Sequence, residues 1–171
     1  MTDTYSSRSE WGDIMDICQI DQTNRADIDA FLIRQWFCLQ MVVHGETIDL
    51  SMADGWYALE DNEIAGLITY QLIDKAMEIL SLDSLREKQG IGTALLGQAV
   101  KHAKDIGIKR IILTTTNDNL SALRFYQKRG FDIFKINLNA VEQSRKIKPE
   151  IPLISMDGIP IKHEIELELI V

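Results

Sequence analysis

Two glycines near the middle of the chain, Gly90 and Gly92, stand at the start of a segment with helical periodicity. A glycine turn that leads into a helix leaves backbone N–H groups free, and the helix dipole adds about half a positive charge there. Such a turn can hold a diphosphate. The alternative is a strand-to-helix turn that binds nothing, and the two glycines alone do not decide between them.

Two better-known phosphate motifs are excluded by the neighbouring residues. A dinucleotide-binding turn needs a third glycine three positions after Gly92, where the chain has Leu95. A nucleoside-triphosphate loop needs Lys and Ser or Thr after Gly97, where the chain has Gln98 and Ala99. The sequence therefore indicates a short anion-binding turn of another kind.

Other catalytic or metal-binding patterns are weak. His44, His102 and His163 lack the spacing of metal ligands, so we expect no metal. No Gly-x-Ser-x-Gly segment indicates a serine hydrolase. Cys18 and Cys38 form no metal-type pair, and Cys38 is better interpreted as a buried apolar thiol than as a nucleophile.

Composition limits the class of protein. The 171 residues are 46% hydrophobic and 26% charged, which suffices for one domain with a core. The net charge of −8 argues against nucleic-acid binding and favours a cationic partner, although acidity can simply confer solubility. With no membrane-length apolar run, no signal peptide and two cysteines, the sequence predicts a cytoplasmic protein without a membrane partner.

The periodicity predicts which elements hold these residues in place. Residues 1–12 are expected to be a loose terminus and 13–171 a single domain. Hairpin strands are predicted at 56–59 and 64–72 around the polar turn 60–63. We expect further strands at 13–20, 39–45, 76–85, 108–116, 131–138 and 163–171, helices at 23–37, 91–106, 119–129 and 139–147, and loops at 47–55 and 148–160. This order predicts an α/β (α+β) fold with a single mixed, mostly antiparallel twisted sheet flanked by helices.

A second segment makes the glycine turn more specific. Asn119, Ala122, Tyr126, Gly130 and Phe131 follow the pattern Asn-x-x-Ala-x-x-x-Tyr-x-x-x-Gly-Phe. Together with the segment GIGTALL, this resembles the GNAT superfamily of N-acetyltransferases, of which the tail resembles an uncharacterised branch. The resemblance covers 56–134, including a glycine in the third strand at position 66. It implies a GNAT-like acyl-CoA N-acyltransferase fold, with acetyl-CoA as the acyl donor.

The resemblance also implies the residues that bind the coenzyme. The glycine turn would hold its diphosphate, the later helix would lie beside its pantetheine arm, and Arg124 and Lys128 could meet another phosphate. An unpaired amide between Leu82 and Ser84 would polarise the thioester carbonyl. The expected coenzyme-binding residues are Leu82, Ser84, Lys88, Gln89, Gly90, Ile91, Gly92, Thr93, Asn119, Ala122, Arg124, Tyr126 and Lys128. Glu87 departs from the family pattern, which has Gln or Arg there.

Three residues are candidates for the chemical step. The match of Tyr126 to the family's tyrosine implies a general acid that protonates the departing thiolate. Glu78 and Asp83, on the strand that borders the acceptor cleft, are candidate general bases. Strand alternation predicts that Glu78 shares a face with Leu80 and Leu82, and that Asp83 points to the opposite face.

The expected function is transfer of an acetyl group from acetyl-CoA to a primary amine of a small molecule or peptide. A protein N-terminal acetyltransferase and a non-catalytic acyl-CoA-binding module that regulates a partner remain alternatives. The alternating C-terminal strand could also act as an edge in a homodimer.

Overall fold

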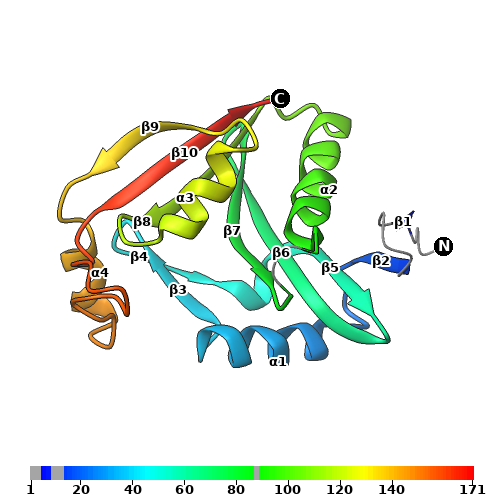
Figure 1. Cartoon of the computed structure of the whole chain (residues 1–171), viewed down its shortest axis with the longest axis horizontal. Helices are drawn as coiled ribbons and strands as arrows, with labels where there is room; N and C mark the ends of the chain where they lie inside the picture. The colour runs from blue at the N-terminus through cyan, green and yellow to red at the C-terminus, as the bar shows by residue number, and fades with distance from the viewer. Residues whose placement is uncertain (1–4, 9–13, 87–88) are drawn as a thin grey trace.

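The secondary structure below is that of a computed structural model, which describes residues 5–8, 14–86 and 89–171. The strands and helices are β1 (Tyr5–Arg8), β2 (Ile14–Gln19), α1 (Arg25–Trp36), β3 (Gln40–Val43), β4 (Glu46–Asp49), η1 (Leu50–Met52), β5 (Asp54–Glu60), β6 (Glu63–Ile73), β7 (Ala76–Ser84), α2 (Ile91–Asp105), β8 (Arg110–Thr116), α3 (Leu120–Gln127), β9 (Asp132–Asn137), α4 (Val141–Ile147) and β10 (Glu164–Ile170). Eight strands form one sheet in the order β1-β2-β5-β6-β7-β8-β10-β9, and β3 and β4 form a separate pair (Figure 1).

The predicted fold class is confirmed. Every strand pairing in the large sheet is antiparallel except β7 with β8. The β5–β6 hairpin turns at Asp61 and Asn62, which both have positive φ values, as short hairpin turns favour. Asn119 caps α3, because its side-chain oxygen accepts a hydrogen bond from the amide of Ala122.

Two segments differ from the prediction. The stretch 47–55, predicted to be a loop, contains β4, η1 and the start of β5. Its strand is only four residues long, and Asp49 stabilises the following 3-10 turn by accepting hydrogen bonds from the amide and hydroxyl of Ser51. Within the terminus expected to be loose, Tyr5–Arg8 pairs with β2 as β1.

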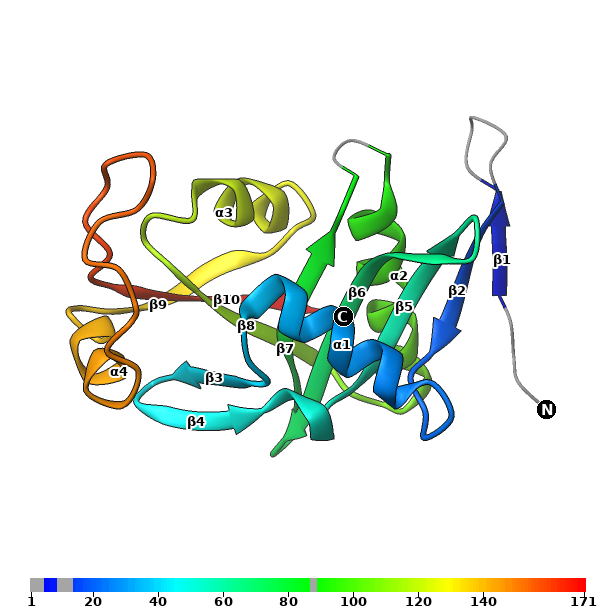
Figure 2. The ribbon, with the colours of Figure 1, turned by 90° about the horizontal axis from the view of Figure 1, so that it is seen from below.

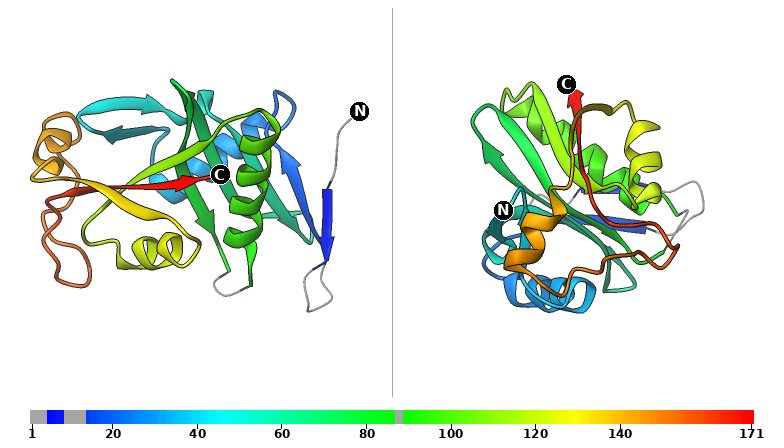
Figure 3. Two further views of the ribbon diagram at one scale, coloured as in Figure 1. Left: turned by 90° about the horizontal axis from the view of Figure 1, so that it is seen from above. Right: turned by 90° about the vertical axis from the view of Figure 1, so that its left-hand side faces the viewer.

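The sheet separates two hydrophobic cores. One contains residues of α2 and α3 packed on Trp56, Ile68, Met77 and Ile79. The other contains Ile28, Phe31 and Leu32 of α1, packed against Leu67 and Leu80. Figures 2 and 3 show α1 and the β3–β4 pair on the sheet face opposite α2. Among the described residues, no helix has the length and apolar character needed to cross a membrane.

Gly66 allows α2 to approach the sheet closely. A Cβ atom at this position would lie 2.5 Å from Cγ2 of Ile91 and 2.8 Å from the carbonyl oxygen of Asp83. The first turn of α2 therefore packs directly on β6 beside the end of β7. This contact fixes where the N-terminus of α2 lies relative to the sheet.

Strand β7 is irregular at Leu80. Thr69 of β6 pairs with Ser81 and Tyr70 pairs with Ile79, so Leu80 is an extra residue on β7. The parallel pairing of β7 with β8 also ends at Ile79 and Leu113, and β8 then turns away from β7 (Figure 1). The two strands thus separate from Leu80 onwards.

The bulge corrects the predicted orientation of the two carboxylates. An extra residue inverts the alternation of side chains beyond it. Glu78 therefore lies on the α1 face, where it accepts a hydrogen bond from Gln71, and Asp83 lies on that same face against Trp36. Leu82 instead packs with the core on the α2 face. The expectation that Asp83 opposes Glu78 was wrong because it assumed a regular strand.

Candidate active site

A cleft of about 720 Å³ opens between the N-terminus of α2, α3 and the separated ends of β7 and β8. We call it the α2–α3 cleft. Most of the residues predicted to bind the coenzyme line it. Its lining includes Leu82, Ser84, Gly90, Gly92, Thr93, Asn119, Ala122, Arg124, Tyr126 and Lys128, together with Trp36, Arg86, Ser121, Phe125 and Arg129.

The floor of the cleft has free backbone donors. Gly90 caps α2 in the left-handed conformation, with φ of 82°, and no side chain caps the helix. Within the described residues, the amides from Gly90 to Thr93 donate to no acceptor, as is usual for the first turn of a helix. These amides and the helix dipole suit a phosphate group.

Cationic side chains surround these amides. Arg124 and Lys128 line the cleft and take part in no ion pair with the described residues. Arg129 stacks 3.6 Å from the ring centroid of Phe125 and donates to Oγ1 of Thr93 over 2.5 Å. Its Nε atom is buried without a partner among the described residues. This part of the protein is positively charged although the whole chain is acidic.

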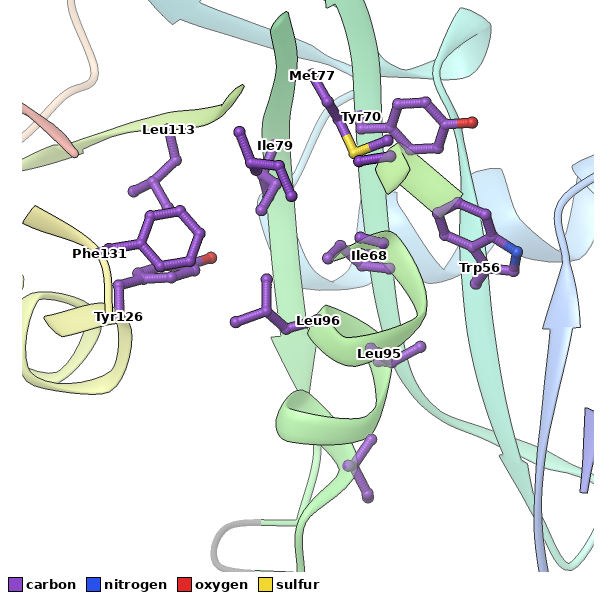
Figure 4. Packing of buried hydrophobic residues seen from close by; sticks show 14 of the residues in the cluster. Trp56, Ile68, Tyr70, Met77, Ile79, Leu95, Leu96, Leu113, Tyr126 and Phe131 are labelled. Atoms are coloured by element: carbon purple, nitrogen blue, oxygen red, sulfur yellow. The ribbon is translucent and has the colours of Figure 1, made fainter. Parts of the chain in front are cut away.

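Tyr126 is buried between two aromatic rings, with edge contacts to Phe125 and Phe131 at centroid distances of 5.1 and 5.3 Å. Figure 4 shows its ring reaching from α3 towards β7. Its hydroxyl forms no hydrogen bond with the described residues. Burial, and secondly the charge of Asp83, raise the pKa of Tyr126 far above its ordinary value. The residue therefore stays protonated and can donate a hydrogen bond into the cleft.

Three of the predicted coenzyme-binding residues are not in the lining. Ile91 is fully buried in the core below α2, so only its backbone amide faces the turn. Gln89 is exposed beside the cleft. Lys88 lies outside the described residues.

A second cavity, of about 700 Å³, lies on the opposite face of the sheet under the β3–β4 pair. We call it the β3–β4 cavity. Its walls carry the carboxylates of Glu46, Asp49, Glu78 and Glu166, against the basic groups of His44 and Lys135. Glu78 is buried and accepts a hydrogen bond of 2.8 Å from Nε2 of Gln71. The cavity is therefore acidic and suits a cationic ligand.

Asp83 differs from Glu78 although both were predicted as general bases. It accepts a hydrogen bond of 3.0 Å from Nε1 of Trp36 and is absent from the lining of either cavity. Burial raises the pKa of Asp83, and the hydrogen bond from Trp36 opposes that rise. The structure brings Asp83 close enough to Tyr126 to influence its pKa, but not into the β3–β4 cavity.

The wall of the β3–β4 cavity contains a histidine that sequence analysis did not select. Nδ1 of His44 lies 2.8 Å from Oε2 of Glu164, and its Nε2 lies 3.2 Å from Oγ1 of Thr114. Glu164 is buried and also accepts a hydrogen bond from Ser144. The hydrogen bond to Glu164 raises the pKa of His44, although partial burial opposes it. No spacing along the chain indicates this pair, because 120 residues separate its members.

The two cavities meet where β7 and β8 separate. Leu80, Leu113 and Thr114 line both of them. Leu80 is the bulge residue, and Leu113 is the last residue of β8 paired with β7. The two cavities are therefore neighbours across the sheet at this point, with these three residues between them.

Arg129 was also missed as a site residue. Basic residues near the C-terminal end of a predicted helix are common, so its position there indicated no site. The signal that could have identified it is its place one helical turn after Phe125, on which it stacks.

Comparisons with known proteins agree with this geometry. The sequence profile of the acetyltransferase (GNAT) family matches residues 13–131. The uncharacterised protein YxbD of Bacillus subtilis (strain 168) is 46% identical over 154 residues, which cover 90% of this chain and 97% of YxbD. The uncharacterised protein YdhI of the same organism is 45% identical over 136 residues, covering 79% of this chain and 85% of YdhI.

Among solved structures, a GNAT family acetyltransferase from Elizabethkingia anophelis with acetyl-CoA bound is similar over nearly the whole length. The superposition has a TM-score of 0.66, with 25% identity, and covers 92% of this chain and 98% of the other.

Proposed function

The chain belongs to the acetyltransferase (GNAT) family, and from this premise we propose that it transfers the acetyl group of acetyl-CoA directly to a primary amine of a small cationic molecule. The single observation that carries the proposal is the junction of a basic cleft and an acidic cavity at Leu80, Leu113 and Thr114. In this proposal a donor and an acceptor would enter from opposite faces and meet there, without a covalent enzyme intermediate. Neither cysteine lines either cavity.

The residues of the α2–α3 cleft fit acetyl-CoA, which supplies an acetyl group activated as a thioester. The amides of Gly90–Thr93 would hold its diphosphate, and Arg124, Lys128 and Arg129 would neutralise phosphate charge. The edge of β7 after Ile79 is unpaired on the β8 side. A backbone amide on this edge, expected between Leu82 and Ser84, would donate to the thioester carbonyl as charge develops on its oxygen.

Tyr126 would donate a proton or a hydrogen bond to the leaving sulfur. Its raised pKa keeps the hydroxyl protonated at neutral pH. The same low-polarity surroundings would also raise the pKa of a bound thiol, since burial disfavours every anion. Burial therefore acts in the same direction on the pKa of the donor and on that of the leaving group.

Glu78 would hold the acceptor ammonium as its counter-ion. Of the two carboxylates predicted on β7, only Glu78 lines the β3–β4 cavity. The remaining carboxylates in the cavity, on Glu46, Asp49 and Glu166, would attract further positive charge on the acceptor. This arrangement favours small amines with more than one positive charge over neutral or acidic amines.

Calorimetry followed by a kinetic screen tests this function. We expect coenzyme A to bind in the micromolar range, and the protein to release free thiol from acetyl-CoA when an acceptor amine is present. Spermidine, L-lysine methyl ester, tyramine and a tetrapeptide beginning with Met serve as acceptors of different charge. Binding of coenzyme A without thiol release for any amine would instead support a non-catalytic acyl-CoA-binding module.

A further inference from the structure

The β3–β4 cavity contains a histidine–carboxylate pair whose position suggests a chemical role. The imidazole of His44 bonds to Glu164 through Nδ1, while Nε2 faces Thr114. Thr114 lines both cavities at the gap where β7 and β8 separate. His44 is therefore one hydrogen bond away from the place where, under the proposed function, the amine meets the thioester.

We propose that His44 is the group that takes the proton from the acceptor ammonium, with Glu164 as its positioning partner. This inference rests on the proposed function and adds the missing base to it. An ammonium ion cannot attack a carbonyl until it loses a proton. Ordinary carboxylates have pKa values near 4 and ordinary imidazoles near 6.5, so an imidazole is the better acceptor at neutral pH.

The hydrogen bonds fix the form of His44 that can accept a proton. An ionised carboxylate only accepts hydrogen bonds, so Nδ1 of His44 must carry the hydrogen that faces Glu164. In the neutral ring, the lone pair is then on Nε2, which accepts from the hydroxyl of Thr114. This is the tautomer that a base aimed at the gap requires.

The proton transfer is balanced within these residues. An N–H bond of the ammonium breaks, its electron pair stays on the nitrogen, and a new N–H bond forms at Nε2. The transfer is direct or passes through the Thr114 hydroxyl, which gives its own proton to Nε2 as it accepts one from the amine. The product is an imidazolium ion that remains bonded to Glu164.

The charges around His44 stabilise that imidazolium. Three carboxylates act on it, those of Glu164 and Glu166 on β10 and that of Glu78 on β7. Glu166 lies 3.7 Å from Nε2 and also binds Lys135 of β9 over 3.0 Å. Lys135 is the one lysine or arginine in the described lining of the cavity.

The local backbone holds the imidazole firmly in this orientation. His44 and Gly45 form the turn between β3 and β4 with φ values of 54° and 74°. The amide of His44 also donates to the Glu164 carboxylate, over 3.2 to 3.3 Å. A His44 that only holds the β3–β4 pair against β10 would make the same contacts. The test must therefore separate this structural role from the role of a base.

The experiment is the pH dependence of kcat for the fastest of the four amines, in wild type and four variants. In wild type we expect kcat to increase with pH, and we call this increase the limb of the profile. His44→Gln should lower kcat at pH 7 by on the order of 100-fold, should abolish the limb, and should change KM for the amine less than about threefold. Thr114→Val should lower kcat by about tenfold or less, with the limb retained.

The variant Glu164→Gln distinguishes a catalytic role of His44 as a base from a purely structural role. Removing the carboxylate lowers the affinity of His44 for a proton, so the limb should persist and move to lower pH. His163→Gln is the matched control, because His163 bonds to the amide of Asn139 and lines neither cavity. Its kcat should stay within about twofold of wild type at every pH.

An unchanged limb in His44→Gln would overturn this inference and leave the proposed function intact. No thiol release with any of the four amines would overturn both. Should His44→Gln fail to fold, the Glu164→Gln profile decides the question: a limb moved to lower pH supports the base, and a limb at the wild-type position overturns it.

Discussion

Glu78 and Asp83 lie on the same face of β7, although they are five positions apart and a regular strand would place them on opposite faces. The extra residue Leu80 produces this arrangement. Glu78 lines the β3–β4 cavity, whereas Asp83 is covered by Trp36. Two carboxylates on one strand therefore have different surroundings, and they form a matched pair for mutagenesis.

Glu78→Gln should raise KM for a cationic amine by about 10- to 100-fold, because a charged contact of about 1.5 to 3 kcal/mol is lost. Its kcat should fall less. Asp83→Asn removes the same charge from the same face and should change KM less than about threefold. Initial rates of thiol release measure both variants. A larger increase in KM for Asp83→Asn would assign the ammonium site to Asp83 instead.

Tyr126→Phe should lower kcat on the order of 100-fold while the Kd for coenzyme A changes less than twofold. The deleted hydroxyl has no hydrogen bond to the described residues, so the melting temperature should not fall. Because the pKa of Tyr126 is raised, its ionisation should also cause no loss of wild-type activity below about pH 10. Unchanged turnover in Tyr126→Phe would remove the general-acid assignment.

Arg129→Gln should weaken coenzyme A binding by about tenfold or more, since the guanidinium is fixed by Phe125 and Thr93 beside the glycine turn proposed to hold the diphosphate. The loss should shrink at high salt, which screens phosphate contacts. Lys104→Gln is the control, because it removes one positive charge from the last turn of α2, far from the cleft. Calorimetry at two salt concentrations compares them, and equal losses in both variants would contradict the assignment.

Gly66→Ala should destabilise the protein by about 1 to 3 kcal/mol, because the new methyl group would overlap Ile91 and the carbonyl of Asp83. Gly97→Ala, inside α2, should stabilise the protein by about 0.5 to 1 kcal/mol, since nothing lies within 4 Å of its added Cβ. Urea unfolding gives both free energies. Two changes of the same sign would show that α2 does not pack on β6 as described.

The bond between His44 and Glu164 should make stability depend on pH. The pKa of His44 is raised from 6.5 in the folded protein, so its contribution is full below pH 6.5 and is lost as pH rises through the raised value. Burial raises the pKa of Glu164, but the hydrogen bonds and charge of His44 together with the hydrogen bond from Ser144 lower it below 4.5. The contribution of Glu164 is therefore lost only as pH falls through that lower value. The difference in melting temperature between wild type and His44→Gln should therefore be largest between about pH 4.5 and 6.5. A difference that grows above pH 7 would contradict this sign.

Elements whose signals are local could be predicted from the amino-acid sequence. The β5–β6 hairpin, the strand from Ala76, the glycine-capped helix α2 and the Asn119 cap of α3 depend on turn residues, periodicity and helix capping, all of which act within a few positions. The pattern around Tyr126 likewise indicated the family, which the comparisons show.

Which side chains share a cavity could not be predicted in the same way, because it depends on how distant strands pack together. The bulge at Leu80 depends on how β6 and β7 pair, and it reversed the predicted face of Asp83. The contact between His44 and Glu164 joins residues 120 positions apart, because β10 returns beside β8 and the β3–β4 turn covers it. Register and long-range packing arise from the whole sheet, so no short stretch of sequence contains them.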